Sequence, residues 1–422
     1  MKKNINFIIL LLLLILLKKI NHNIFNNYND ILKYISIIII LVSSFYFVIK
    51  LNYKNYDVKK MNNIIRESNS NDLKALFMSL GAKIGVGSIA GISIAIYING
   101  PGVLLWIWII TSLSSILTYC ETFLGSKYQN GVFSYIKKGL NNRIALIYTM
   151  LLIFIYEIGF VGIQTNTIYK SLIELNIINS KLTIIIILLI ISLLIFNRLE
   201  KIITITSKIV PLMCLIYIIV SIPLLFKINI IRIIEIIIKD GINNNKLLKI
   251  ITAGFYRGIF ATESRIGTSS ISSTISNNRE KQAMVQLIGV HFISLIIISL
   301  TGIIVINYSN NYIGKINGIE ILLNIYNNFY GLSGKIYINI IILLFAISTI
   351  LCSYFYTIKA IEYIKNKITN IDIIIIKVVI IIFSFLGMVI KSSIIWSIID
   401  NLIIYLLIIN ICAMIKLRKE IK

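Results

Sequence analysis

Apolar runs of about 20 residues recur along almost the whole chain. A helix of that length crosses the hydrocarbon core of a bilayer, which is about 30 Å thick. Of the 422 residues, 58% are hydrophobic and only 14% are charged, a composition too apolar for a water-soluble fold of this size. The sequence therefore predicts an all-α polytopic membrane protein. The eleven expected spans are residues 31–49, 75–98, 103–125, 144–168, 181–197, 206–226, 251–274, 283–307, 336–358, 371–390 and 394–415.

A single transmembrane domain is expected over residues 31–422, because only short polar stretches separate most of the spans. The two longest gaps, 227–250 and 308–335, are amphipathic, which is typical of helices that lie in the membrane surface. Residues 1–30 form a separate N-terminal segment. Its apolar run from Phe7 to Leu17 has two lysines on each side and no small-residue cleavage site after it. Both an uncleaved short or interfacial helix and the core of a signal peptide fit this pattern.

The basic residues are distributed unevenly between alternate loops. The chain has 41 Lys and Arg against 17 Asp and Glu, a formal charge of +24. One set of loops, beginning with the connection before residue 75, carries roughly twice as many Lys and Arg as the other, as the positive-inside rule requires of cytoplasmic loops. The charge therefore indicates orientation in the cytoplasmic membrane, with the C-terminus in the cytoplasm. The expected partner is the lipid bilayer, and neither a nucleic acid nor an obligate protein partner is expected.

Two of the expected spans are poor continuous helices. Residues 81–91 contain four glycines, and residues 254–270 contain three glycines among clustered serines and threonines. Each glycine costs about 1 kcal/mol relative to alanine inside a helix, and the hydroxyls compete for backbone partners. Unwound backbone at membrane depth persists where it lines a cavity. Both spans are therefore predicted to break within the membrane.

The broken spans are the first and the sixth of the ten that follow the leading helix. Breaks at matching positions of two halves indicate inverted five-helix repeats, here about 73–227 and 250–416, with a substrate site between them. The N–H groups after a break suit a carboxylate, and the freed carbonyl groups suit a cation.

The glycines of the first segment also permit another interpretation. Gly81 with Gly85, and Gly87 with Gly91, form GxxxG pairs, which in membrane helices usually serve close packing. The occurrence of two matched segments, both with polar and charged residues at membrane depth, favours broken helices. A dinucleotide-binding motif at Gly85-Val86-Gly87 is rejected because no strand precedes it.

The order of motifs resembles the alanine or glycine:cation symporter family, also known as the sodium:alanine symporters. The stretch from Gly85 to Gly91, followed by 99–102 and 106–108, is similar to the family's GTGNIAG, GGPG and FWMW. The resemblance extends from residue 31 to about residue 410. The further matches are Glu121 with Lys127-Tyr128 (AE…KY), Gln164 to Thr167 (QANS), Ser207 to Pro211 (EKLVP), Arg257 to Glu263 (RGLFSNE), and Phe345 to Leu351 with Glu362-Tyr363 (FAFTTIL…EY).

The resemblance implies a leucine-transporter-like fold with broken core helices 1 and 6, and symport of a small neutral amino acid, alanine or glycine, with a sodium ion. It also implies that backbone N–H groups of the first break hold the substrate carboxylate and that a sodium ion lies between the first and eighth core helices. The implied substrate-binding residues are Gly85, Val86, Gly87, Ser88, Gln164, Thr262 and Glu263, and the implied sodium ligands are Gly81, Ile84, Ser348 and Thr349.

The chain departs from the family pattern at several of these positions. Val86 and Ser88 replace a threonine and an asparagine, residues 262–265 replace the NEAG stretch, and a typical aspartate of the seventh helix is absent near Ile293. Backbone contacts to a carboxylate survive such changes, so amino-acid binding is better supported than alanine specificity or sodium coupling. The alternatives are a transport-inactive relative that acts as a sensor and a sodium-independent exchanger, in which the ammonium of Lys83 replaces a bound sodium ion.

Polar residues inside the spans complete the list of candidates. Charges there are usually functional or paired, and Arg257 with Glu263 is one expected pair. An intramembrane enzyme is excluded by the lack of a nucleophile or metal motif, and His291 is expected in the core. Nothing repeats as a channel filter. The four cysteines, Cys120, Cys214, Cys352 and Cys412, are expected to be buried, without disulfides or metal.

Overall fold

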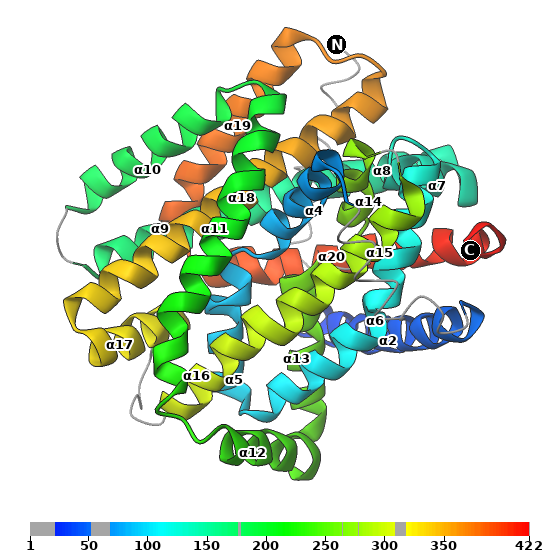
Figure 1. The fold of residues 1–422 in the computed structure, drawn as a ribbon. Coiled ribbons are helices and arrows are strands. Elements are labelled where there is room, and N and C mark those ends of the chain that lie inside the picture. The colour runs from blue at the N-terminus through cyan, green and yellow to red at the C-terminus, as the bar shows by residue number, and fades with distance from the viewer. Residues whose placement is uncertain are drawn as a thin grey trace.

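The computed structural model describes residues 22–51, 68–175, 179–263, 265–276, 278–308 and 318–421, and all secondary structure in these ranges is helical (Figure 1). Most of the N-terminal segment 1–30 lies outside the described residues. The first half of the chain contains α2 (His22–Lys50), α4 (Ser70–Lys83), η2 (Val86–Ser88), α5 (Ala90–Asn99), α6 (Gly102–Lys127), α7 (Val132–Gly139), α8 (Asn142–Ile153), η3 (Phe154–Phe160), α9 (Val161–Ile173), α10 (Ser180–Ile195) and α11 (Leu199–Leu225).

The second half of the chain also consists of helices joined by short connections. It contains α12 (Ile230–Asn243), α13 (Leu247–Thr262), α14 (Thr268–Ser272), η4 (Ser273–Ile275), α15 (Arg279–Phe292), η5 (Ile293–Ile298), α16 (Ser299–Tyr308), α17 (Gly318–Tyr330), α18 (Leu332–Lys365), α19 (Asn370–Val389), α20 (Ser392–Lys416) and η7 (Arg418–Glu420).

Seven helices of the described part are long and apolar enough to cross a membrane, and one bent pair, Ser70–Lys83 with Val86–Asn99, makes an eighth span. These eight coincide with eight of the expected spans. Of the other three, 31–49 and 181–197 fall on the shorter apolar stretches of α2 and α10, and 251–274 falls on α13 and α14 with a break between them. The protein is therefore polytopic, and the count of eleven spans stays a prediction.

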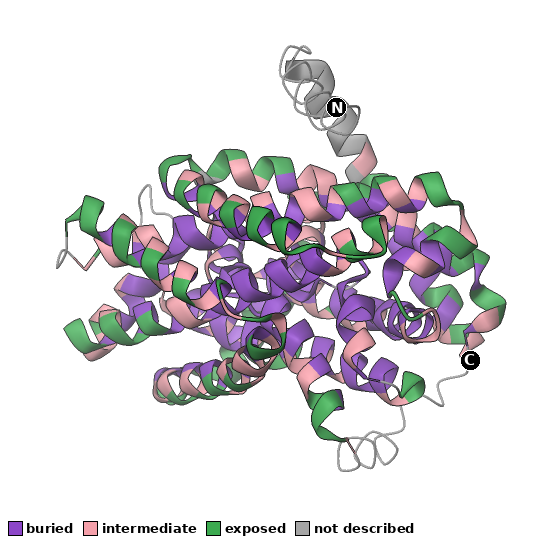
Figure 2. Ribbon diagram, turned by 90° about the horizontal axis from the view of Figure 1, so that it is seen from above, coloured by how far each residue is buried: buried purple, intermediate pink, exposed green. Residues whose placement is uncertain are grey.

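Burial separates the centre of the molecule from its surface. Figure 2 shows buried residues along the inner helices and exposed ones along the periphery. The exposed side chains include many large aliphatic ones on α10, α11, α12 and α19, as expected of a surface that faces lipid. Cys120, Cys214 and Cys352 are buried, but Cys412 is exposed, so the prediction for that residue is wrong. Its position on α20 faces away from the packed centre, which an apolar run alone does not reveal.

Two helices occupy the amphipathic gaps where surface helices were expected. α12 lies across the lower ends of α13 and α16 in Figure 1, and α17 lies within the second gap, 308–335. The carboxylate of Asp240 on α12 accepts a hydrogen bond of 2.7 Å from the backbone N–H of Gly102, at the start of α6. The indole of Trp106 donates to the backbone oxygen of Gly241 at 2.9 Å. These bonds hold α12 against the first turns of α6.

Some of the glycines serve helix packing. A Cβ on Gly81 would lie 2.9 Å from Val210 of α11 and 3.0 Å from Cys352 of α18. A Cβ on Gly254 would lie 2.7 Å from the Cβ of Trp106 in α6. The packing interpretation is therefore correct for these glycines, whereas the helix breaks lie at other residues.

Candidate functional site at the two broken helices

The first break separates α4 from α5 and bends the pair by 60°. α4 ends at Lys83, Gly85 adopts an extended conformation, and residues 86–88 form one turn of 3-10 helix. The backbone N–H of Val86 donates to the side-chain oxygen of Gln164 on α9 at 3.1 Å. A Cβ on Gly85 would lie 2.6 Å from the hydroxyl of Thr349 and 2.7 Å from the amide nitrogen of Gln164. The break is thus held from two sides, and only glycine fits at position 85.

The second break follows α13 and contains three residues with positive φ. Glu263 has φ 41°, Arg265 has φ 78° and Gly267 has φ 84°. Ser264 lies outside the described residues. Non-glycine residues in this conformation are uncommon and cluster at functional sites. The carboxylate of Glu263 accepts a hydrogen bond of 2.8 Å from the hydroxyl of Tyr156, and its other oxygen is buried without a partner. Thr262 donates back to the carbonyl of Gly258 at 2.7 Å.

The two breaks meet at Gly87 and Phe260. A Cβ on Gly87 would lie 2.5 Å from the ring of Phe260, which belongs to the last turns of α13. That ring stacks on Phe160 with centroids 4.9 Å apart, and it lies 4.4 Å from the ring of Trp396 on α20. Aromatic side chains from three elements therefore cover the first break. In the sequence Phe260 stands out only as part of a motif, and nothing distinguishes Phe160 or Trp396.

The expected ion pair between Arg257 and Glu263 is not formed, so that prediction is wrong. The guanidinium of Arg257 lies 4.6 Å from the ring centroid of Trp396, and Glu263 bonds to Tyr156 instead. The turn of α13 and the left-handed conformation of Glu263 direct the two side chains to different neighbours.

Three of the four predicted sodium ligands lie together. The hydroxyls of Ser348 and Thr349 on α18 each donate to the carbonyl oxygen of Gly81 at 3.1 Å. The hydroxyl of Thr349 also lies 3.4 Å from the carbonyl oxygen of Ala82. Neutral oxygens of this kind are ligands that hard cations accept. Ile84 caps α4, its N–H donates to Leu80, and no hydrogen bond joins it to either hydroxyl.

Four buried charged residues lie in or beside the second break: Glu263, described above, with Lys83, Glu121 and Arg265. The ammonium of Lys83 donates to the hydroxyl of Ser269 on α14 at 2.7 Å, and not to Gly81, Ser348 or Thr349. One carboxylate oxygen of Glu121 on α6 accepts from the N–H of Gly267 and from the amide of Asn410, both at 2.9 Å. The fully buried guanidinium of Arg265 donates to Ser114 at 2.5 Å.

Asn410 holds this arrangement together, although nothing in the sequence distinguished it. Its amide also donates to the backbone oxygen of Arg265 at 2.8 Å, and its oxygen accepts from the hydroxyl of Tyr135 at 2.5 Å. It is fully buried on α20. An asparagine in the middle of an apolar run was the only signal available.

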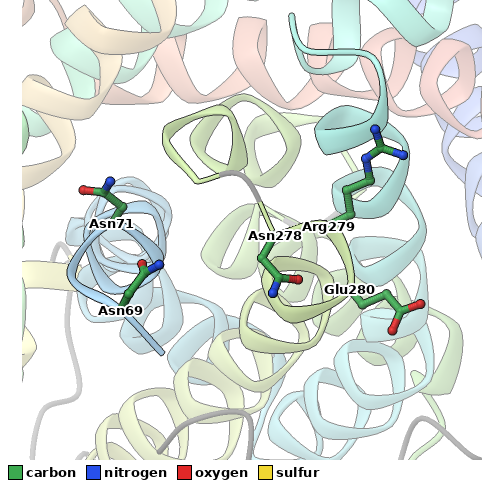
Figure 3. A pocket seen from close by; sticks show the side chains of 5 residues that line it. All are labelled: Asn69, Asn71, Asn278, Arg279 and Glu280. Carbon is green, nitrogen blue, oxygen red and sulfur yellow. The ribbon is translucent and has the colours of Figure 1, made fainter. Parts of the chain in front are cut away.

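An open hollow lies outside this arrangement. It has a volume of about 580 Å³ and lies where the N-terminal ends of α4 and α15 approach each other (Figure 3). None of the predicted substrate-binding or sodium-binding residues lines it. Its lining residues are Asn69, Asn71, Asn278, Arg279 and Glu280.

The described residues form a many-helix bundle of a membrane protein in which two helices are broken, α4–α5 and α13–α14. A solved structure shares this fold: the substrate-bound outward-open state of a Na⁺-coupled sialic acid symporter superposes with a TM-score of 0.58 at 14% sequence identity, over 88% of this chain and 82% of that one. This likeness supports the predicted leucine-transporter-like fold.

The chain belongs to the sodium:alanine symporter family, whose model matches residues 18–422. The predicted family is thereby confirmed, and membership makes the protein a transporter and not an enzyme. The amino-acid carrier protein AlsT of Bacillus subtilis is 27% identical over 320 residues, 71% of this chain and 68% of AlsT. The probable sodium/glutamine symporter GlnT of the same species is 26% identical over 423 residues, 93% and 87% of the two chains. A sodium/proton-dependent alanine carrier protein of Bacillus sp. PS3 is 25% identical over 264 residues, 57% and 58% of the two chains.

Proposed function

We propose that this protein is a secondary active symporter that imports a small neutral amino acid, alanine or glycine, with sodium across the cytoplasmic membrane. It works by alternating access between the inverted repeats 73–227 and 250–416 of an eleven-span, leucine-transporter-like domain, with its C-terminus in the cytoplasm and without an obligate protein partner. Family membership and the names of the relatives, which include amino-acid, glutamine and alanine carriers, support this proposal.

The substrate binds between the two breaks. Its carboxylate is held by backbone N–H groups of Gly85 to Ser88, at the N-terminal end of the half-helix α5, where the helix dipole favours an anion. Gln164 orients this backbone through its bond to Val86. The substrate ammonium lies toward Thr262 and Glu263, where one buried carboxylate oxygen has no other partner.

One observation supports a small substrate above all others. The ring of Phe260 approaches Gly87 so closely that a single added methyl group would lie 2.5 Å from it. Phe160 stacks on that ring and Trp396 packs against it at a tilt, so the ring cannot yield easily. This crowding of the first break by aromatic rings supports a substrate with a small side chain, such as glycine or alanine.

The coupling ion binds beside the first break. The carbonyl of Gly81 and the hydroxyls of Ser348 and Thr349 supply neutral oxygens from α4 and α18. The fourth proposed ligand is the carbonyl of Ile84, which follows α4. A sodium ion held between these two helices favours one arrangement of them, and this preference links ion binding to transport.

Uptake into proteoliposomes tests the function. The purified protein is reconstituted, and accumulation of labelled alanine and glycine is measured under an inward sodium gradient, in choline, and under a proton gradient. Accumulation driven by sodium is expected. If labelled amino acid exchanges as fast in choline as in sodium, the protein is a sodium-independent exchanger. If it binds amino acid but shows no uptake in any gradient, it is a transport-inactive sensor. A panel of amino acids of increasing size, from glycine to glutamine, tests the substrate class in the same assay.

A further inference from the structure

The first turn of α4 is joined to the chain after the second break by one carboxylate. Asp72 is fully buried, and its Oδ1 accepts hydrogen bonds from the hydroxyl of Ser276 and, at 3.1 Å, from the side-chain amide of Gln282. The same amide also donates to the backbone oxygen of Asp72 at 3.1 Å. Ser276 follows η4, and Gln282 belongs to the first turn of α15. We call these three residues the Asp72 latch.

The second oxygen of the Asp72 carboxylate fixes the position of the latch on α4. It accepts a hydrogen bond of 3.1 Å from the backbone N–H of Asn69, whose side chain accepts from the N–H of Asp72 at 2.9 Å in return. Hydrogen bonds to an ionised carboxylate are stronger than neutral ones, and a buried carboxylate that loses its partners is strongly destabilising. The latch is therefore released only where water can replace Ser276 and Gln282.

The open hollow of about 580 Å³ lies beside the latch and gives water this access. Asn69 and Asn71 line it on the α4 side and residues 278–280 on the α15 side, so it lies between the two segments that the latch joins (Figure 3). Each lining residue is within three positions of a latch residue in the sequence. The volume is in the range of sites that hold small molecules. The hollow can therefore serve as an aqueous mouth next to the latch.

A polar seam continues from the latch toward the first break. Ser79 lies about two turns beyond Asp72 on α4, and its hydroxyl is 3.5 Å from that of Ser269 on α14. Both serines are fully buried. On another side, α4 is held by the hydroxyls of α18 at the carbonyl of Gly81. The half-helix α4 is thus attached at two places, by the latch near its start and by the candidate sodium site near its end.

We propose that the Asp72 latch is the gate of this transporter on the side that the charge distribution assigns to the cytoplasm. While the latch is formed, the seam between α4 and α14 is closed. When water replaces Ser276 and Gln282, α4 separates from α14 and α15, and the seam opens into the hollow, through which the amino acid and the sodium ion leave. The inference rests on the proposed function for what passes through the gate, whereas closure of the seam depends only on the contacts of the latch.

Alkylation of a cysteine within the seam tests the proposal. Ser79→Cys is introduced together with Cys412→Ser, which removes the exposed native thiol, and the rate of reaction with a membrane-impermeant maleimide is measured on the purified protein in detergent. Asp72→Ala and Gln282→Leu are then added separately, and each removes one side of the latch. We expect each to raise the rate at least about tenfold, as the loss of a hydrogen bond to a charged group predicts.

Asp372→Ala is the matched control for Asp72→Ala. Asp372 forms the same capping box at the start of α19 that Asp72 forms at the start of α4, but its partners are Thr369 and Lys365. This control removes a helix cap without changing the latch, so the alkylation rate should remain that of the parent protein. Unchanged rates in both latch variants, or an equal increase in the control, overturn the proposal.

Uptake into proteoliposomes gives a second measurement. A latch that opens too easily reduces the fraction of molecules whose site is open to the outside, so the KM for uptake should rise in Gln282→Leu by about the factor found for alkylation. Faster alkylation with an unchanged KM would show that the seam is not on the transport path and would overturn the proposal. Absence of uptake by the unmodified protein would instead contradict the proposed function, and alkylation would still decide whether the latch closes the seam.

Discussion

The backbone N–H of Val86 donates to the side-chain oxygen of Gln164 at 3.1 Å, across 78 residues of sequence. Both residues are buried, Val86 within the first break and Gln164 on α9. The bond fixes the orientation of the peptide on which the proposed carboxylate site depends. Because Gln164 also lies against Gly85, α9 controls the shape of the break as well as its hydrogen bonding.

Removal of the Gln164 acceptor should weaken substrate binding. Gln164→Ala leaves a buried N–H without its partner, at a cost of about 1–3 kcal/mol, and we expect the KM for amino-acid uptake to rise about tenfold. Gln286→Ala is the matched control, since its amide donates 3.2 Å to the backbone oxygen of Ala75 in α4, away from the break. An unchanged KM in Gln164→Ala, or an equal rise in the control, would contradict the role of Gln164.

A methyl group at Gly87 should strongly reduce uptake by a folded protein. In Gly87→Ala the new Cβ meets the Phe260 ring at 2.5 Å, and we expect uptake to fall at least about tenfold, as overpacking of 1–3 kcal/mol predicts. Gly91→Ala is the control, because its Cβ meets its neighbours at 3.6 Å or more. Phe260→Leu in combination with Gly87→Ala should restore part of the uptake. Full activity of Gly87→Ala in proteoliposomes would show that the site is elsewhere.

Loss of the α18 hydroxyls should reduce the affinity for sodium. We expect Ser348→Ala and Thr349→Val each to raise the sodium concentration for half-maximal uptake about tenfold, because each removes one oxygen ligand. Ser353→Ala is the control: its hydroxyl donates to the backbone oxygen of Thr349 at 2.9 Å and is not a proposed ligand. Sodium titrations of uptake distinguish the variants, and an unaltered sodium dependence in both ligand variants would rule out this ion site.

The hydrogen bonds that join the C-terminal turn η7 to the end of α6 should be lost at low pH. Glu420 accepts hydrogen bonds from Lys127 at 2.5 Å and from Tyr128 at 2.6 Å, at the end of α6. These bonds lower the pKa of Glu420. Burial, together with the hydrogen bond to the Glu420 carboxylate, raises the pKa of Tyr128 to about 12. A carboxylate with a lowered pKa stabilises the fold above its ordinary pKa of about 4.3, and this contribution is lost as the pH falls through the lowered value.

Glu420→Gln tests that contribution. Since the Lys127–Glu420 pair is about one-third exposed, we expect a loss of stability of no more than about 1 kcal/mol at pH 7. This loss should disappear as the pH falls through the lowered pKa of Glu420. Thermal unfolding as a function of pH measures it. Glu362→Gln is the control, because it breaks a more exposed pair with Lys359 and should change the melting temperature less. A pH-independent effect of Glu420→Gln would contradict the assignment.

The local sequence predicted the membrane helices and their breaks because both depend on residues that are close together in the chain. A run of apolar residues favours a membrane helix whatever it packs against. Eight expected spans therefore coincide with helices, or with the bent pair, that are long and apolar enough to cross a membrane. Clustered glycines weaken a helix wherever they stand, and both predicted breaks are present: α4 ends at Lys83 and α13 ends at Thr262. The order of motifs likewise sufficed to identify the family.

The sequence by itself thus determined the membrane class, the family and the positions of both helix breaks. Only the tertiary structure decided which side chains meet there: Phe260 against Gly87, Arg257 over the ring of Trp396, and Lys83 with Ser269. Such pairs join residues of different helices, and their contact depends on the rotation and crossing of those helices. Hydrophobicity sets where a helix lies in a membrane, but packing against neighbouring helices sets which face it presents.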